Sequence, residues 1–316
     1  MDDKQAVYGV DVSKAKCVVA SYDSEAVIDV PNQLPALAQW LREIAVGSIV
    51  AMEATGAYHK LLASLAHAAG MQVFILNPQA LKHYAKGIGL RAKTDPLDAC
   101  LIARYAKHER AKLMPWQPPT PECDRLSQLL QRRDRLVSAQ KMLVQSLSGM
   151  PALKAQRLSI TASLKRMIVN IELLMRVELA RVPTLAQLHR RLCTIVGVGF
   201  VTAAQLVACL TRLRFARVDS FIAYTGLDPK PDDSGERHGR RVLSKNGPRL
   251  LRQLLYTSGM AAAHSKLFKP IYLALLARGL KTTEAIVILA RKIARIAFAL
   301  YRSEDSFDSQ RHLKAA

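Results

Sequence analysis

The sequence predicts an α/β domain followed by a region that is almost entirely helical. Three observations support this division of the 316 residues. Residues 7–76 alternate short β-rich runs with segments that repeat apolar residues at helical spacing, and a further helix at 96–107 closes this region. A proline-rich break follows at 114–121, and the residues after it carry almost no strand signal. A chain of this length is long enough for two or three domains.

The first region reads as an antiparallel meander that continues into alternating strands and helices. The predicted strands are Val7–Val12, Cys17–Tyr22, Ala26–Val30, Ser48–Met52 and Met71–Leu76. The predicted helices are Leu34–Ile44, Tyr58–Ala69 and Pro96–Lys107. This order predicts a mixed sheet whose faces are covered by helices.

The region after the proline break repeats apolar residues every seven positions. One series is Leu129, Leu136, Leu143 and Met150, and a second is Ile160, Met167 and Leu174. Two long amphipathic helices with this spacing indicate either a coiled-coil arm or an intrachain hairpin without a partner.

A further change comes at Thr194, where an apolar run contains the G-x-G turn of Gly197 and Gly199 before a new helix. The pattern resembles a helix-hairpin-helix element, whose glycines let backbone N–H groups face a phosphate. A turn between two packed helices is the alternative. We therefore expect four parts, which are 1–113, the linker 114–121, the coiled-coil region 122–184 and the C-terminal domain 185–316.

The charge balance indicates a polyanionic partner. The chain has 46 Lys and Arg against 25 Asp and Glu, a formal net charge of +21, and nucleic acid is the usual partner of such a protein. No uncharged apolar run is long enough to predict a membrane span. The polar, acidic start does not resemble a secretory signal, and the five cysteines form no C-x-x-C pair. These features predict a cytoplasmic protein without disulfides or structural zinc.

Four carboxylates form the strongest candidate for chemistry. Asp11 lies inside the first apolar strand, Glu53 ends a later strand, and Asp95 and Asp98 begin a helix. Pro96 suits the first helical position, which would make Asp95 the N-cap. Hard oxygen ligands on these elements favour Mg²⁺ or Mn²⁺, as in RNase H-like metal nucleases. Each acid also has a structural interpretation, as a cap, a turn residue or a partner of the helix dipole.

A second candidate is the loop that contains Ser234. One hydroxyl stands there among four basic or imidazole side chains, at Arg237, His238, Arg240 and Arg241. Such side chains could hold a phosphate, but a serine needs activation to act as a nucleophile. The residues alone favour a surface loop with turn-forming Ser and Asp. Ser244 is a competing hydroxyl, placed before a helix that begins near Pro248.

The ordered motifs resemble the DEDD transposases of the insertion-sequence "IS one-ten" family, relatives of the pilin-inversion recombinases. The matching segments are Gly-Val-Asp-Val-Ser-Lys at 9–14, Met-Glu-Ala-Thr-Gly at 52–56, Lys-Thr-Asp-Pro-Leu-Asp-Ala at 93–99, Gly-Leu-Asp-Pro at 226–229, Asp-Ser-Gly at 233–235, Leu-Ser-Lys-Asn-Gly at 243–247, and 249–256. All four acidic positions are present.

The resemblance implies a RuvC-like catalytic domain, a coiled-coil region and a C-terminal transposase domain. It also implies a bridge RNA that pairs with donor and target DNA, and a serine nucleophile that forms a phosphoserine link, for which we take Ser234. Basic residues expected to contact nucleic acid, besides those of the Ser234 loop, are Arg91, Lys93, Lys245 and Arg249. We expect the protein to form a homo-oligomer, either a dimer or a tetramer. We also expect it to act on the nucleoid of a prokaryote.

Two other functions stay open at this point. A Holliday-junction-type metal nuclease would use water as its nucleophile and would not need Ser234. A scaffold that binds RNA and DNA without catalysis would not need the charge of Asp11.

Overall fold

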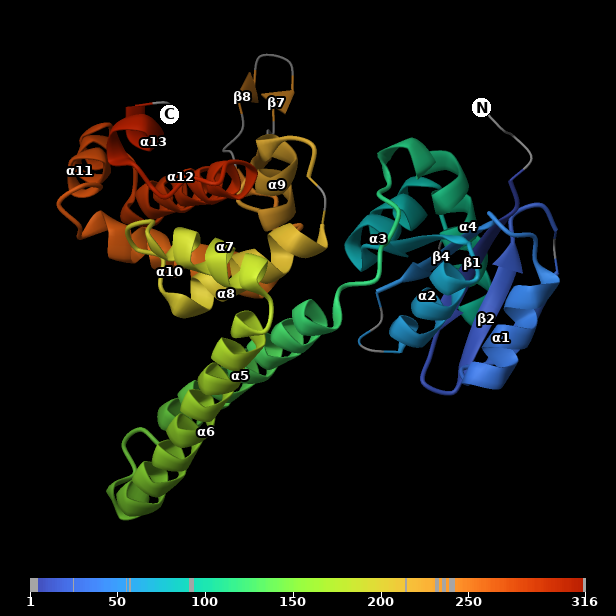
Figure 1. Ribbon diagram of the computed structural model, residues 1–316, viewed down its shortest axis with the longest axis horizontal. Coiled ribbons are helices and arrows are strands. Elements are labelled where there is room, and N and C mark those ends of the chain that lie inside the picture. Colours follow the sequence, from blue (N-terminus) through green and yellow to red (C-terminus); the bar gives the residue numbers. More distant parts are fainter. Residues whose placement is uncertain are drawn as a thin grey trace. The chain divides into compact units, whose positions relative to one another are not determined.

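The computed structural model describes residues 5–24, 26–54, 56, 58–90, 94–213, 215–230, 233–234, 237–238 and 242–314. It divides into two compact units, Met1–Pro118 and Pro119–Ala316, which are considered separately (Figure 1).

The first unit is built on a mixed five-stranded sheet with the order β3-β2-β1-β4-β5. Its strands are β1 (Val7–Val12), β2 (Lys16–Ser21), β3 (Val27–Pro31), β4 (Ile49–Glu53) and β5 (Gln72–Leu76). β1, β2 and β3 pair antiparallel, whereas β1 pairs parallel with β4, and β4 with β5. The predicted meander and the mixed α/β class are confirmed.

Helices cover both faces of this sheet. They are α1 (Leu34–Glu43), α2 (His59–Ala68), α3 (Pro78–Gly87), α4 (Asp95–Glu109) and the short η1 (Arg110–Lys112). Because successive side chains point to opposite faces of a strand, Val10 packs with Leu62 of α2 in one cluster, while Val7 packs with Ile102 of α4 in another. The sequence patterns located every helix of this unit except α3 and η1.

The strand β1 and the helix α4 approach each other closely at Gly9. A Cβ atom built on Gly9 would lie 2.2 Å from the backbone nitrogen of Ala103 and 2.2 Å from the carbonyl oxygen of Ala99. Both atoms belong to the backbone, so neither can turn away as a side chain could. Only glycine fits here, and the facing positions of α4 are also small and fully buried.

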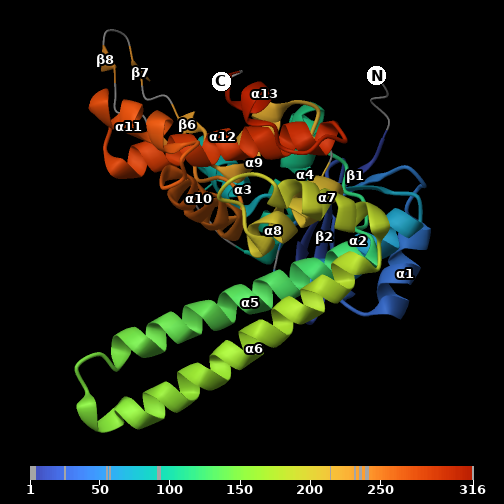
Figure 2. The same ribbon diagram turned by 60° about the vertical axis from the view of Figure 1, so that its left-hand side comes forward.

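The second unit begins with two long helices, α5 (Pro121–Ser146) and α6 (Lys154–Ala180), joined through η2 (Pro151–Leu153). They run antiparallel side by side (Figure 2). We call residues 121–180 the arm. Arg133 Nε donates to Glu172 Oε1 at 2.7 Å across the pair. Near its base, the half-exposed Arg125 bonds the largely buried carboxylate of Glu178 at 2.8 Å.

The rest of the second unit is a helical bundle interrupted by short strands. Its helices are α7 (Pro183–Cys193), α8 (Phe200–Arg212), α9 (Val218–Thr225), α10 (Arg249–Ala263), α11 (Lys269–Ala277), α12 (Thr282–Arg302) and α13 (Ser309–Lys314). Between α9 and α10, β6 (Pro229–Lys230) pairs with β9 (Val242–Leu243), and β7 (Asp233–Ser234) pairs with β8 (Arg237–His238). The segment expected as a polar loop therefore contains two small ladders.

The base of the arm and the bundle share one hydrophobic core. Leu126 and Leu130 of α5 and Met175 of α6 are fully buried in the same cluster as Leu206 of α8 and Leu289 of α12. The arm is thus anchored by apolar burial at one end only. Among the described helices, none combines the length and apolarity that crossing a bilayer requires.

The contact at Gly9 predicts a large and local loss of stability on substitution. Gly9→Ala would force α4 away from β1, and we expect the free energy of unfolding to fall by about 3 kcal/mol, at the upper end for overpacking. Gly87→Ala is the matched control, because no atom lies within 4 Å of its added Cβ. Urea unfolding of the full chain measures both. Equal stability of the two variants would contradict the close packing.

Candidate active site

Asp11 and Glu53 lie side by side at one end of the sheet. The parallel register pairs Gly9 with Ala51 and Val10 with Met52, so one further step aligns Asp11 with Glu53. Side chains two residues apart share a face, which puts both acids on the face that Gly9 and Ala51 present to α4. Both carboxylates are half-buried at the carboxyl ends of adjacent parallel strands.

Asp95 and Asp98 extend the same face from α4. Helix positions four apart lie above one another, so Asp95 continues the row of Ala99 and Ala103 that meets Gly9. In the same way Asp98 continues the row of Ile102, which packs on the sheet. Asp98 is half-buried and Asp95 is exposed. The first turn of α4 thus points its acids toward the end of the sheet that carries Asp11. We call the four acids the acidic edge.

The prediction that Asp95 is the N-cap is wrong by one residue. The N-cap is Thr94, whose Oγ1 accepts a hydrogen bond from the amide of Leu97 at 3.5 Å, while Asp95 and Pro96 are the first two helical residues. Threonine is among the preferred N-cap residues, although it ranks below aspartate. The shift leaves the Asp95 carboxylate outside the capping hydrogen bond, in the first turn, where the positive end of the helix dipole stabilises negative charge.

The charge of Asp95 also reaches the hairpin between β1 and β2. The pKa of the Lys16 ammonium is raised above its usual value by the hydrogen bond to Asp29, 2.6 Å away, and desolvation opposes this effect. The charges of Asp29 and then of Asp95 raise it further. Lys16 is therefore a cation at neutral pH beside the acidic edge.

The donor chemistry of the acidic edge fits a divalent cation. All four side chains offer carboxylate oxygens, the ligands that Mg²⁺ and Mn²⁺ prefer. Among the described residues, no three Asp, Glu, His or Cys side chains lie close enough together to form a metal-binding group. Arg91 and Lys93 lie outside the described residues.

Ser234 belongs to the second unit. It ends the short strand β7, and its backbone pairs with Arg237 of β8. Only the backbone of these two residues is described, and Arg240 and Arg241 lie outside the described part of the chain. The structure thus brings the four acids to one edge of the first unit and assigns Ser234 to a β ladder of the other unit.

Ser244, the competing hydroxyl, has a structural partner. Its Oγ donates a hydrogen bond to the carboxylate of Asp228, and its amide donates to the Asp228 carbonyl at 3.0 Å. Ser244 therefore fastens the end of the loop segment to its beginning. Lys245 follows in the left-handed region, with φ 54°, and its amide donates to the carbonyl of Gly226.

The G-x-G turn joins α7 to α8, and its two glycines differ in environment. Gly197 has φ +90°, and a Cβ there would lie 2.4 Å from the carbonyl oxygen of Ser258 on α10. This glycine therefore serves helix packing. Gly199 is the N-cap of α8, is exposed, and has no atom within 4 Å of a built Cβ.

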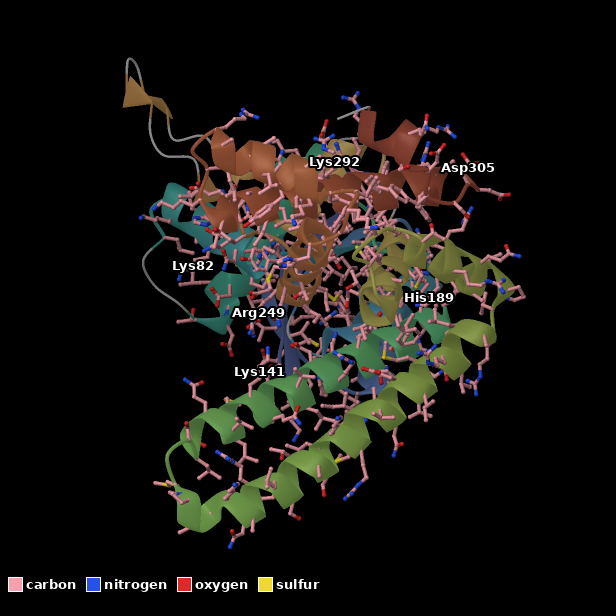
Figure 3. The ribbon with its side chains drawn as sticks, turned by 90° about the vertical axis from the view of Figure 1, so that its left-hand side faces the viewer. Lys82, Lys141, His189, Arg249, Lys292 and Asp305 are labelled. Atoms are coloured by element: carbon pink, nitrogen blue, oxygen red, sulfur yellow. The ribbon has the colours of Figure 1, made fainter. Side chains whose placement is uncertain are left out.

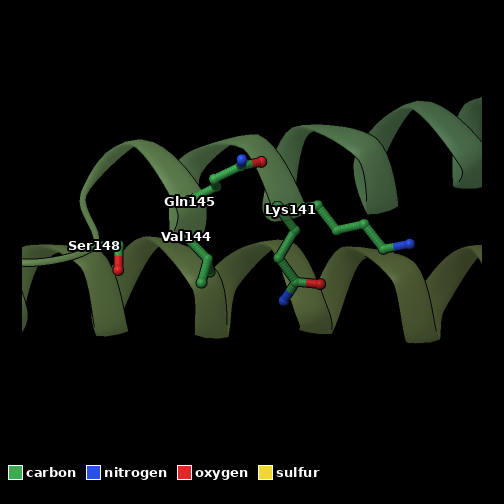
Figure 4. Close-up of a pocket in the computed structure, with 5 residues that line it drawn as sticks. Lys141, Val144, Gln145 and Ser148 are labelled. Carbon is green, nitrogen blue, oxygen red and sulfur yellow. The ribbon is translucent and has the colours of Figure 1, made fainter.

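Two surface depressions add residues to this description. One lies near the turn between α5 and α6, and its side chains come from the end of α5 and the turn (Figure 4): Gln140, Lys141, Val144, Gln145 and Ser148. This lining contains no acid or histidine. The other lies beside the start of α10, where Arg249 stands (Figure 3). It includes Arg252, Gln253 and Tyr256, which lie within the segment 249–256 that carries part of the family resemblance.

Two family models match the chain. A DEDD transposase model of the IS110 group matches residues 8–150, which include the acidic edge. A model described as "Transposase IS116/IS110/IS902 family" matches residues 189–273, which include the Ser234 ladder.

Curated relatives agree with these matches. A pilin gene-inverting protein of Moraxella lacunata is 28% identical over 269 residues, 83% of this chain and 82% of the relative. The transposase for insertion sequence element IS1111A of Coxiella burnetii is 26% identical over 339 aligned positions, covering 95% of this chain and 91% of the relative. The chain therefore belongs to the IS110 family of transposases and recombinases, enzymes that act on DNA.

Proposed function

We propose that this transposase is a site-specific recombinase that cleaves and rejoins DNA through a covalent bond between Ser234 and a DNA phosphate. A divalent cation site at the acidic edge and a bridge RNA complete the proposal. The observation that carries it is the register of β1 and β4, which aligns Asp11 with Glu53 on the face that meets α4.

The topology of the first unit supports an RNase H-like, RuvC-like domain. Three antiparallel strands lead into two parallel ones, with helices on both faces. The carboxyl ends of parallel strands are where α/β proteins commonly bind ligands. Asp11 and Glu53 occupy these ends on β1 and β4.

The acidic edge would hold Mg²⁺ or Mn²⁺. When bound, such ions polarise a phosphodiester and stabilise the charge that develops during its displacement. The roles of the chain's own residues follow from their positions. Asp11 and Glu53 are fixed by strand pairing, and Thr94 caps the turn that presents Asp95 and Asp98.

The serine step conserves the phosphodiester bond energy. Ser234 Oγ attacks the scissile phosphorus, the P–Oγ bond forms, and the bond from phosphorus to a deoxyribose oxygen breaks. The serine proton passes to a base and the departing oxygen takes up a proton. Attack by a deoxyribose hydroxyl of the exchanged strand then reverses these changes and restores the serine. No nucleoside triphosphate is required.

Basic residues near the two centres would bind the strands. Arg237, Arg240 and Arg241 follow Ser234 closely enough in sequence to neutralise the attacked phosphate. Arg91 and Lys93 precede Asp95 and would steer a phosphate to the acids. Such contacts supply affinity without base recognition.

Sequence recognition would come from a bridge RNA paired with donor and target DNA. The formal charge of +21 suits a protein that holds both RNA and DNA. The sequence shows no DNA-recognition-helix signature, which is in keeping with recognition by base pairing. The exposed Gly199, at the start of α8, could bring a backbone amide to a phosphate. The enzyme would then act on the nucleoid, in the cytoplasm of a prokaryote.

Exposed apolar residues on the arm are the evidence for assembly with a second copy of this chain. Its second heptad series, Ile160, Met167 and Leu174, is about half exposed at each position, because α5 packs on the other side of α6. Exposed apolar residues at heptad spacing are the pattern of a helix that awaits a partner helix. A coiled coil formed by two such arms would let one subunit's serine serve another subunit's acids.

Replacement of Ser234 distinguishes a serine recombinase from a nuclease that uses water as its nucleophile. With cognate RNA, Mg²⁺ and end-labelled DNA, we expect the wild type to form a protease-sensitive protein–DNA adduct and Ser234→Ala to form none. Ser244→Ala is the control, which we expect to keep the adduct and to melt at a lower temperature, since it loses the bond to Asp228. Clean cutting by Ser234→Ala without an adduct would identify water as the nucleophile.

Metal binding can be tested without any reaction. A ligand bound only by the native state raises its stability, so Mn²⁺ should raise the melting temperature of the wild type. We expect Asp11→Asn and Glu53→Gln to reduce this rise by more than half. Asp23→Asn, an exposed acid in the turn after β2, should show the wild-type rise. An equal rise in melting temperature for all four proteins would show that Mn²⁺ does not bind at the acidic edge. This result would favour the alternative function, a scaffold without catalysis.

Assembly through the arm predicts a change of mass. The double variant Met167→Glu/Leu174→Glu places charge on the exposed face of α6 without touching the core. Sedimentation velocity should show dimers or larger species for the wild type and monomers for this variant. Val46→Glu, at a residue 80% exposed in the first unit, should sediment as the wild type does. A wild type that is monomeric over the whole concentration range would refute the arm as an interface.

A further inference from the structure

We propose that the depression beside α10 binds one unpaired nucleotide of a DNA or RNA strand, with the base against Tyr256 and the phosphate at the rim between Lys245 and Arg249. The inference rests on the proposed nucleic-acid chemistry for the class of its ligand. It assigns a binding site apart from the acidic edge and the Ser234 ladder. We call this depression the α10 pocket.

The inner wall of the α10 pocket is apolar. Leu227 is fully buried, and Leu243 and Val287 are half-buried around it. The half-buried Tyr256 adds an aromatic ring to this wall. Bases of single strands stack on aromatic side chains, and this interaction accepts any base because each has a π face.

The rim of the α10 pocket is positively charged. Lys245 and Arg249 are exposed there, and neither makes an ion pair with any residue that the structure describes. Arg291 lies one turn beyond Val287 on α12. Arg291 is not among the lining residues, and burial and then the charge of Arg295 lower the pKa of its guanidinium, while the carboxylates of Asp228 and Asp219 raise it. An anion at this rim would neutralise the charges of Lys245 and Arg249.

The segments around the pocket are joined by contacts within the protein that do not depend on a ligand. Arg252 Nη1 donates to the carbonyl of Gly247 at 3.1 Å and to that of Thr225 at 3.4 Å. A Cβ on Gly247 would lie 1.7 Å from the carbonyl oxygen of Tyr224, so the two chain segments touch directly. These contacts fix Lys245 and the start of α10, which reduces the entropy that binding must overcome.

Size and polarity together favour a nucleotide over a bare phosphate. The cavity measures about 310 Å³, at the lower end of the range for small-molecule sites. A phosphate alone would leave the apolar wall and the Tyr256 ring in contact with water. Gln253, whose amide both donates and accepts, lies among the lining residues and suits the hydrogen-bonding edge of a base.

The test uses full-length protein and short single-stranded oligonucleotides, one DNA and one RNA, each with a single 5-iodo-pyrimidine as a photocrosslinker. We expect mass spectrometry to map the crosslink to Tyr256. Tyr256→Ala should raise the oligonucleotide Kd at least about fivefold, as loss of base stacking does, and Tyr256→Phe should restore most of the affinity. Gln253→Leu, close in size, should weaken binding without loss of fold.

Arg278→Gln is the control for charge, because this exposed residue lies after α11, outside the pocket. Arg249→Gln should weaken binding several-fold more than Arg278→Gln does. A crosslink formed with only one of the two oligonucleotides would name that strand as the occupant.

A crosslink that maps away from the pocket, with Tyr256→Ala and Gln253→Leu binding within twofold of Arg278→Gln, would overturn the inference. Failure of this inference can be distinguished from failure of the proposed function. Failure of the wild type to form a Ser234 adduct leaves the crosslink result intact, and an adduct formed by the wild type does not require a crosslink at Tyr256.

Discussion

The contact between Gly9 of β1 and the Ala99–Ala103 turn of α4 is the constraint on which the acidic edge depends. A helix with larger residues at these positions would stand further from the sheet, and the acids of its first turn would be carried away from Asp11. The strand register is the second constraint, because the pairing of β1 with β4 aligns Asp11 with Glu53. Backbone geometry therefore sets the separation of the acids before any side chain is considered.

The elements of this edge could be predicted from sequence, whereas their spacing could not. Asp11 inside an apolar strand and Glu53 at the end of another are visible as acids in unusual surroundings. Gly9 carried no such signal, because sequence does not reveal what a strand glycine will meet. The N-cap was misplaced because Thr94 and Asp95 are both good capping residues, and only the backbone dihedrals distinguish them.

Contacts distant in sequence account for most of what was missed in the second unit. The heptads predicted α5 and α6 but left open whether these helices pair with each other or with a partner. In the structure they pair with each other, and Ile160, Met167 and Leu174 remain about half exposed. The Ser244–Asp228 hydrogen bond spans 16 residues and gives Ser244 a structural role at the end of the loop segment. The α10 pocket arises from three separate segments, so no single stretch of sequence indicates it.

The central proposal is that the two units carry different parts of the chemistry, with the four acids on one unit and the proposed nucleophile, Ser234, on the other. The most direct test is peptide mapping of the protein–DNA adduct after digestion with protease and nuclease. The account predicts a nucleotide mass attached to the peptide that contains Ser234, formed by the wild type and lost when Asp11 is replaced by Asn. A nucleotide attached to another residue, or cut DNA with no modified peptide, would contradict it.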